Sequence, residues 1–208
     1  MALSLPSSIR PLTRRGLLKA GLCGAAGLAL YSGEIGRHWI EVTEHEVHLR
    51  GLSAAFDGMR IAQLSDIHLD NFTEPFFLRH VVERINRIKP DVVFLTGDFV
   101  TARFHAKSAS TKFARDAAWQ CAGILGGLES KALYAVLGNH DIGVGAEEIS
   151  AALGANGITV LRNACLPIER SSARIWIAGV DDHSTVIQTR SGLSPNRSAI
   201  KPMNPSSC

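Results

Sequence analysis

The sequence has little of what several protein classes require. Its net charge is only +3 over 208 residues, and much of the basic excess stands near the start, at Arg10, Arg14, Arg15 and Lys19. A nucleic-acid-binding surface needs a basic patch in the folded part of the chain, so we predict no nucleic-acid binding. The charged fraction of 20% and the hydrophobic fraction of 46% exclude a disordered chain and are typical of a globular protein.

Thiolate metal sites are missing as well. The four cysteines form no Cys-x-x-Cys pair and show no cysteine–histidine spacing of the kind found in zinc sites. The chain is also too short for two ordinary domains plus a leader, although 208 residues are enough for one sizeable core. We therefore look for one folded domain whose chemistry does not depend on cysteine.

The sequence contains no apolar run long enough to cross a bilayer. An uncharged stretch from Ala20 to Tyr31 is too short for a hydrocarbon core of about 30 Å. It follows Thr13-Arg14-Arg15-Gly16-Leu17-Leu18-Lys19, and a basic segment before a short apolar one is typical of a signal peptide.

The paired arginines resemble the twin-arginine export signal. We expect residues 1–40 to engage the twin-arginine translocase and to carry the protein to the periplasm or the outer face of the inner membrane. No clean Ala-x-Ala cleavage site follows Tyr31, so removal of the leader and its retention as a membrane anchor both stay open.

Apolar periodicity predicts an α/β fold for residues 41–183. We expect strands at residues 59–65, 91–96, 132–137, 159–161 and 174–180, after an opening edge strand that contains Val42, Val47 and Leu49. We expect helices at residues 76–88, 112–128 and 146–153, with Thr73, Glu74 and Pro75 starting the first of them. Alternating strands and helices indicate a sheet with helices on its faces.

Side chains with metal-binding chemistry follow three of the predicted strands. They occur in Asp66-Ile67-His68, Gly97-Asp98 and Gly138-Asn139-His140-Asp141. Because strands of an open α/β sheet deliver their carboxyl ends to one crevice, we expect these side chains to meet. Carboxylates, imidazoles and an amide oxygen, without thiolates, suit a hard or borderline divalent metal.

The local spacing favours the same interpretation. Asp66 and His68 are two residues apart, so in an extended segment both side chains point to the same side. A carboxylate such as Asp98 can bridge two ions about 3.5–4 Å apart, the spacing that holds both oxygens of an in-line phosphoryl displacement. Gly97 and Gly138 relieve crowding where the chain turns sharply toward a ligand.

The three motifs together resemble the first three blocks of the calcineurin-like metallophosphoesterases, over about residues 59–182. The resemblance implies that family's sandwich of β-sheets flanked by helices. It also implies hydrolysis of a phosphate-ester substrate, either a phosphodiester, a phosphomonoester or a pyrophosphate. The implied cofactors are two divalent ions, Mn²⁺, Zn²⁺ or Fe²⁺.

The resemblance also implies residue roles. Asp66 and His68 would bind the first ion, Asp98 would bridge, and Asn139 would bind the second. His140 would contact the phosphate and protonate the leaving group, with Asp141 helping to orient it. A hydroxide bridging the metals would be the nucleophile.

Two departures from family patterns narrow the choice among the branches of this family. Purple acid phosphatases have a tyrosine three residues after the aspartate of Gly-Asp, where this sequence has Thr101. Protein Ser/Thr phosphatases end the third block with glutamate, where this sequence has Asp141. With its leader, the sequence looks most similar to small exported bacterial phosphodiesterases. Relatives in that branch include hydrolases of UDP-diacylglucosamine in lipid A synthesis, which by analogy suggests a nucleotide-sugar lipid as substrate.

The family's later blocks are not seen in this sequence. The resemblance implies one more histidine after a further strand and a Gly-His-x-His block, but after His140 the only histidine is His183. Residues from about 184 onward are polar and lack periodicity. We expect residues 184–208 to be a non-native tail and the phosphoesterase domain to be incomplete at its C-terminal end.

An incomplete ligand shell would impair the site, because the ligands are needed to offset the repulsion between two neighbouring cations. The alternative hypothesis is a non-catalytic remnant that binds at most one metal.

Overall fold

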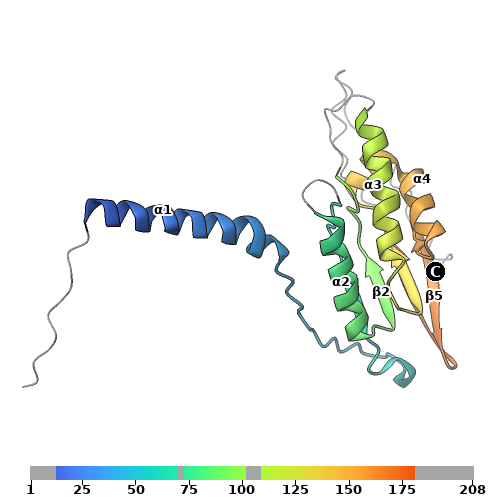
Figure 1. Ribbon diagram of the computed structural model, residues 1–208. Helices are drawn as coiled ribbons and strands as arrows, with labels where there is room; N and C mark the ends of the chain where they lie inside the picture. Colours follow the sequence, from blue (N-terminus) through green and yellow to red (C-terminus); the bar gives the residue numbers. More distant parts are fainter. Residues whose placement is uncertain (1–12, 70–72, 102–108, 181–208) are drawn as a thin grey trace, which may run out of the picture. The chain divides into compact units, whose positions relative to one another are not determined.

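The computed structural model describes residues 13–69, 73–101 and 109–180 (Figure 1). The chain divides into two compact units, Met1–Glu46 and Val47–Cys208. The predicted tail at residues 184–208 and His183 lie outside the described residues.

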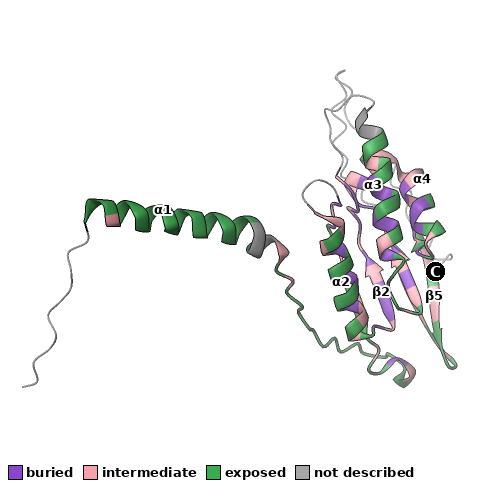
Figure 2. Cartoon of the chain, in the orientation of Figure 1, coloured by how far each residue is buried: buried purple, intermediate pink, exposed green. Residues whose placement is uncertain are grey.

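The first unit contains helix α1 (Arg14–Leu30), followed by the single turns Tyr31–Ile35 and Gly36–His38. Thr13 caps α1, because its side-chain hydroxyl accepts a hydrogen bond from the Gly16 amide at 3.2 Å. No residue of α1 is buried (Figure 2). Among the helices of the described residues, none combines the length and the apolar character needed to cross a membrane.

The second unit is built on a four-stranded parallel sheet. Its strands are β1 (Ile61–Leu64), β2 (Val92–Leu95), β3 (Ala132–Ala135) and β4 (Thr159–Val160), which lie in that order. The crossovers contain α2 (Pro75–Ile88), α3 (Ala109–Leu125) and α4 (Asn139–Ala155). Right-handed crossovers between strands in sequential order place all three helices on one face of the sheet.

Figure 1 shows these helices side by side, and α3 contacts both α2 and α4. The predicted α/β fold is therefore confirmed.

The main core lies between the sheet and the three helices. Strands β2 and β3 and the three helices contribute apolar side chains that are almost fully buried, including Val93, Leu95, Leu78, Leu125 and Leu153. The i, i+4 and i+7 spacing of Leu78, Val82 and Ile85 explains how α2 buries one stripe against the sheet. Strand β2 is buried along most of its length, whereas β3 alternates between buried and half-buried residues.

Helix α2 begins one residue earlier than the predicted start at residue 76. Its N-cap is Glu74 and Pro75 is its first residue, a position where the missing proline amide costs nothing. The helix ends at Ile88, and its C-cap Lys89, directly before Pro90, has a left-handed φ of 53°. The predicted end at residue 88 is confirmed.

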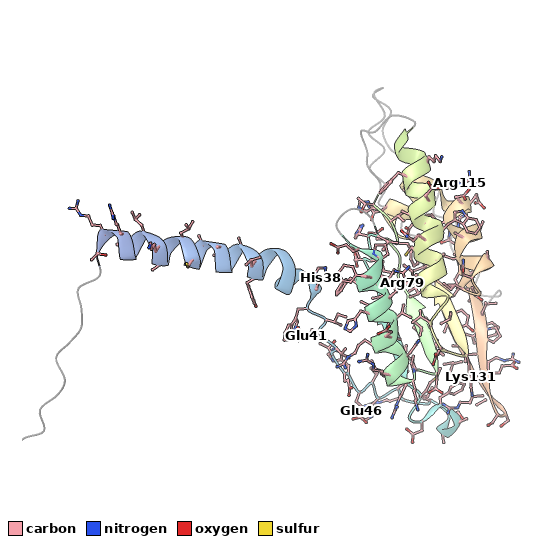
Figure 3. All side chains as sticks on the ribbon, viewed as in Figure 1. His38, Glu41, Glu46, Arg79, Arg115 and Lys131 are labelled. Carbon is pink, nitrogen blue, oxygen red and sulfur yellow. The ribbon has the colours of Figure 1, made fainter. Side chains whose placement is uncertain are left out.

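Helix α4, which begins within the third motif, is fixed to α3 by Glu148. Its Oε1 atom accepts hydrogen bonds from Arg115 Nε at 2.9 Å and from Trp119 Nε1 at 2.6 Å (Arg115 is labelled in Figure 3). The prediction of a helix at residues 146–153 found only the second part of α4. Gly145, with a φ of 146°, separates a first segment that begins at Asn139.

Two further predictions about the strands need correction. Residues 39–49 contain no strand, so the predicted opening edge strand is wrong. Strand β5 (Ala164–Arg170) was not expected, because Pro167 interrupts its pattern. It pairs antiparallel with β6 (Ala173–Gly179), and proline is tolerated there because this pair forms a separate two-stranded sheet with only edge strands.

Candidate metal centre

The first two motifs lie in the loops that follow β1 and β2, and the third follows β3 and runs into the first turn of α4. The first two loops remain hydrogen-bonded beyond the strands themselves. The amides of Asp66, His68 and Leu69 donate to the carbonyls of Gly97, Asp98 and Phe99 at 3.2, 2.8 and 2.9 Å. The loop after β1 is therefore held along the loop after β2 by main-chain hydrogen bonds.

Three predicted metal ligands have left-handed backbones. Asp66, His68 and Asp98 have φ angles of 54°, 46° and 54°. The predicted extended conformation of the Asp66–His68 segment is therefore wrong. Left-handed residues other than glycine are uncommon, with aspartate and histidine among the types that adopt this conformation more readily. Each such residue costs of order 1–3 kcal/mol, and such residues cluster at functional sites.

Close backbone approach explains the glycines of the second and third motifs. A Cβ atom on Gly97 would lie only 2.8 Å from the Gly138 Cα atom. A Cβ atom on Gly138 would lie 2.7 Å from both the backbone nitrogen and the Cγ atom of Asp98. The loops after β2 and β3 can touch only without these side chains, which confirms the crowding expected from the sequence.

Asp141 joins these two loops. Its side chain is fully buried, and both of its oxygens accept hydrogen bonds. Oδ2 accepts from the amides of Asp98 at 2.8 Å and Gly138 at 3.0 Å, and Oδ1 accepts from the Phe99 amide at 2.9 Å. Burial raises the pKa of Asp141 to about 6, although hydrogen bonds from the three amides favour the carboxylate and oppose that rise.

The sequence did not reveal this function of Asp141 in holding the loops together. It comes from main-chain partners more than forty residues away, which no local pattern specifies. The predicted role of Asp141 in orienting His140 stays a prediction.

One group of side chains has the spacing of a metal site. His68, Asp98 and His140 each offer a ligand atom, and these atoms lie within 4.8 Å of one another. His68 Nε2 is 3.8 Å from Asp98 Oδ2, which is too long for a hydrogen bond. Two ligands that each lie about 2.1 Å from one ion have a separation of this order. The imidazole and carboxylate donors therefore fit a divalent cation.

The orientation of the group is fixed by the surrounding structure. The His140 amide donates to Asp98 Oδ1 at 3.0 Å, so this carboxylate is held from the start of α4. The rings of His68 and His140 meet edge to face, with centroids 4.8 Å apart. All three side chains are half-buried, which leaves the site open to a substrate from solvent.

Asp66, another predicted ligand, is not part of this group. Asp66 is exposed, and its Oδ2 atom accepts a hydrogen bond from the Ser65 hydroxyl at 2.6 Å. Asn139 is the first residue of α4, beside His140 in the chain. The structure thus brings together His68, Asp98 and His140, while the metal-binding roles of Asp66 and Asn139 stay predictions.

A parallel α/β sheet that presents imidazole and carboxylate donors at the carboxyl ends of its strands has the architecture of a metal-binding α/β domain. The comparison with protein families agrees with this class. The family described as calcineurin-like phosphoesterase matches residues 59–188, more than half of the chain. The chain therefore belongs to the calcineurin-like phosphoesterase family.

Individual relatives support the same assignment. The uncharacterized metallophosphoesterase YkuE of Bacillus subtilis is 31% identical over 179 residues, which cover 80% of this chain and 56% of YkuE. YkoQ of the same organism, also an uncharacterized metallophosphoesterase, is 31% identical over 61% of this chain and 44% of its own length.

The UDP-2,3-diacylglucosamine pyrophosphatase LpxG of Chlamydia trachomatis is 39% identical over 61 residues, 29% of this chain and 18% of LpxG. The chain spans about half the length, or less, of the curated relatives it matches.

Replacing Asp141 with asparagine tests its function in holding the loops. The Asp141→Asn side chain keeps one acceptor oxygen but turns an NH₂ group toward backbone amides that are themselves donors. We expect the free energy of unfolding to fall by about 1–3 kcal/mol, measured by urea denaturation in the presence of a chelator. Asp116→Asn, on the exposed side of α3, is the matched control and should change stability by less than about 0.5 kcal/mol. Equal stability of the two variants would contradict this function.

A second variant tests the contact between the loops. Gly138 has a φ of −83°, so the Gly138→Ala substitution brings no backbone strain and acts only through the clash of its Cβ with Asp98. We expect a loss of about 1–3 kcal/mol in urea denaturation, as for other overpacked sites. Calorimetric titration should also show weaker Mn²⁺ binding, because Asp98 is displaced.

Gly154→Ala, in open space on α4, is the control for this variant, and alanine should stabilise the helix there by about 0.5–1 kcal/mol. If both alanine variants behave alike, the close contact is not required.

Proposed function

We propose that this chain hydrolyses phosphate esters with the help of divalent cations bound at the ends of β1, β2 and β3. The observation that carries the proposal is the convergence of His68, Asp98 and His140, whose ligand atoms lie within 4.8 Å of one another although they come from two separate loops and the start of α4. Membership of the calcineurin-like phosphoesterase family supports the same chemistry.

The proposed roles follow from the placement of each side chain. His68 and Asp98 would hold one ion, and Asp66 and Asn139 are the candidates to complete a site for two. Bound cations of this kind neutralise charge on the phosphoryl oxygens and activate water for attack. His140, whose backbone is fixed to Asp98 and whose ring borders the same space, is placed to protonate the departing oxygen.

The leader supports a proposal about location. Residues 14 and 15 are both arginine at the start of α1, and the rest of this helix contains no acidic residue. We propose that the twin-arginine translocase exports the folded protein, and that it works in the periplasm or on the outer face of the inner membrane. The exposed apolar residues of α1, among them Leu18, Leu22 and Leu28, are suited to retention at the membrane surface.

The substrate proposed for this site is a nucleotide-sugar lipid. The name of the chlamydial relative makes the pyrophosphate bond of UDP-2,3-diacylglucosamine a candidate. A half-buried, open metal centre suits a large substrate that approaches from a membrane surface.

A second candidate is a protein that binds only one ion and does not catalyse hydrolysis. It is favoured by the exposed position of Asp66, whose Oδ2 atom is hydrogen-bonded to Ser65. Within the described residues the compact group supplies one carboxylate and two imidazoles, enough ligands for a single cation. The amount of bound metal separates this candidate from a two-metal enzyme.

Catalysis is tested with bis(p-nitrophenyl) phosphate, and with UDP-2,3-diacylglucosamine as the candidate natural substrate. We expect Mn²⁺ or Zn²⁺ to stimulate hydrolysis and Asp98→Ala to abolish it, because the substitution removes a central ligand of the group. Asp116→Ala, which changes an exposed aspartate on α3, should keep the wild-type rate. The readout is release of p-nitrophenol or UMP.

Elemental analysis of the same preparation gives the metal content. Two ions per chain together with turnover would support the enzyme. One ion or fewer, with no turnover from a folded and metal-loaded preparation, would favour the non-catalytic candidate and overturn the proposal.

Export is tested by changing both arginines of the pair to lysine. Because the translocase distinguishes paired arginines from other basic residues, we expect the Arg14→Lys, Arg15→Lys double variant to stay in the cytoplasm. Cell fractionation of a host with two membranes, followed by immunodetection, measures the distribution. Arg10→Lys, outside the pair, should be exported like the wild type. Export of the double variant at the wild-type level would refute this route.

A further inference from the structure

Thr101 contacts the ring of one predicted metal ligand. Its hydroxyl oxygen lies 3.2 Å from His68 Nδ1, within hydrogen-bonding distance. The other ring nitrogen, Nε2, faces Asp98 Oδ2 at 3.8 Å. The two nitrogens of His68 therefore have different neighbours, a hydroxyl on one side and a carboxylate with ligand spacing on the other. In the sequence, Thr101 served only to distinguish the chain from the purple acid phosphatases, which have a tyrosine at this position.

The remaining conformational freedom of His68 is the rotation of its imidazole ring. Its backbone is fixed, because its amide donates to the Asp98 carbonyl at 2.8 Å. Rotation of the ring by half a turn would place a carbon against the Thr101 hydroxyl and would move Nε2 away from Asp98. The contact with Thr101 opposes that rotation, since only the observed orientation gives the hydroxyl a nitrogen partner.

Thr101 is itself presented by an immobilised segment. Phe99 and Val100, which precede it, are both almost fully buried, and the Phe99 amide is held by Asp141. The hydroxyl is thus positioned by the core and not by a free surface side chain. A half-buried location also limits competition from water for the same contact.

We propose that Thr101 is a positioning residue that orients the His68 ring and fixes its tautomer. The hydroxyl oxygen accepts a hydrogen bond from the Nδ1–H group, which leaves the lone pair of Nε2 directed toward Asp98 and free to bind a cation. Hydrogen bonds of this kind to the non-ligating nitrogen commonly fix the tautomer of metal-binding histidines. The inference deepens the proposed function and rests on it for the metal, whereas the orientation of the ring can be measured without any metal.

The test uses four variants of the full chain, each with a single substitution. Thr101→Val keeps the shape of the side chain and removes the hydroxyl, Thr101→Ala removes it without adding a methyl group in its place, and Thr101→Ser restores it. Thr159→Val is the matched control, because Thr159 lies exposed on β4, where valine suits a strand. Urea denaturation first identifies the variants that fold.

Two readouts are compared. The first is Zn²⁺ affinity from competition with a chromophoric chelator. We expect Thr101→Val and Thr101→Ala to weaken it by about 10- to 100-fold, as for other partners of ligating histidines, while Thr101→Ser and Thr159→Val stay close to the wild type. The second is the ¹⁵N chemical shift of both His68 nitrogens in metal-free protein, assigned with His68→Gln. We expect the proton on Nδ1 in the wild type and a shift of its population toward Nε2 without the hydroxyl.

The outcomes separate the two proposals. Unchanged His68 shifts in Thr101→Val and Thr101→Ala would overturn the positioning role, whether or not the affinity changes, because any loss would then arise elsewhere. A wild-type chain that binds no Zn²⁺ would sink the proposed function, yet the shifts in metal-free protein would still decide the role of Thr101. Altered shifts with recovery in Thr101→Ser would support it.

Discussion

The site depends on the buried carboxylate of Asp141. Its two oxygens bind three main-chain amides, two from the loop after β2 and one from the loop after β3. These loops are separated in sequence by α3 and β3, so neither could fix the other by local structure. Burial of this charge is unfavourable and raises the pKa of Asp141, but the amides supply hydrogen bonds that an apolar residue could not. The same contact sets the place of Asp98 relative to the start of α4.

Around this contact, the groups that hold the loops together differ from the side chains that would bind a metal. Main-chain hydrogen bonds, Gly97 and Gly138 bring the loops together, and only then do His68 and Asp98 reach the spacing of metal ligands. The left-handed backbones at the ligands are tolerated because the surrounding contacts determine them. A strained backbone at a set of donors, held by neighbours that bind no metal themselves, is typical of a pre-organised functional site.

Much of the fold was predictable because its signals are local. The stripe of Leu78, Val82 and Ile85 predicts α2, and the apolar run of β2 predicts a buried strand. The motifs at the strand ends predicted which loops meet, since parallel strands deliver their carboxyl ends to one edge. Strand β5 was missed because Pro167 contradicts the strand pattern. Both strands of a two-stranded sheet are edge strands, and an edge strand tolerates a proline that a central strand does not.

Within the site, residue types were easier to predict than conformations. The glycines could be recognised because a turn toward a ligand leaves no room for a Cβ atom. The left-handed φ of Asp66 and His68 could not be predicted from the sequence, because it depends on pairing with the loop after β2. The hydrogen bonds by which Asp141 joins the loops use main-chain amides and leave the side chains of His68 and Asp98 to the metal. The choice of ion then falls to these donor types and to the supply of ions in the compartment where the chain folds.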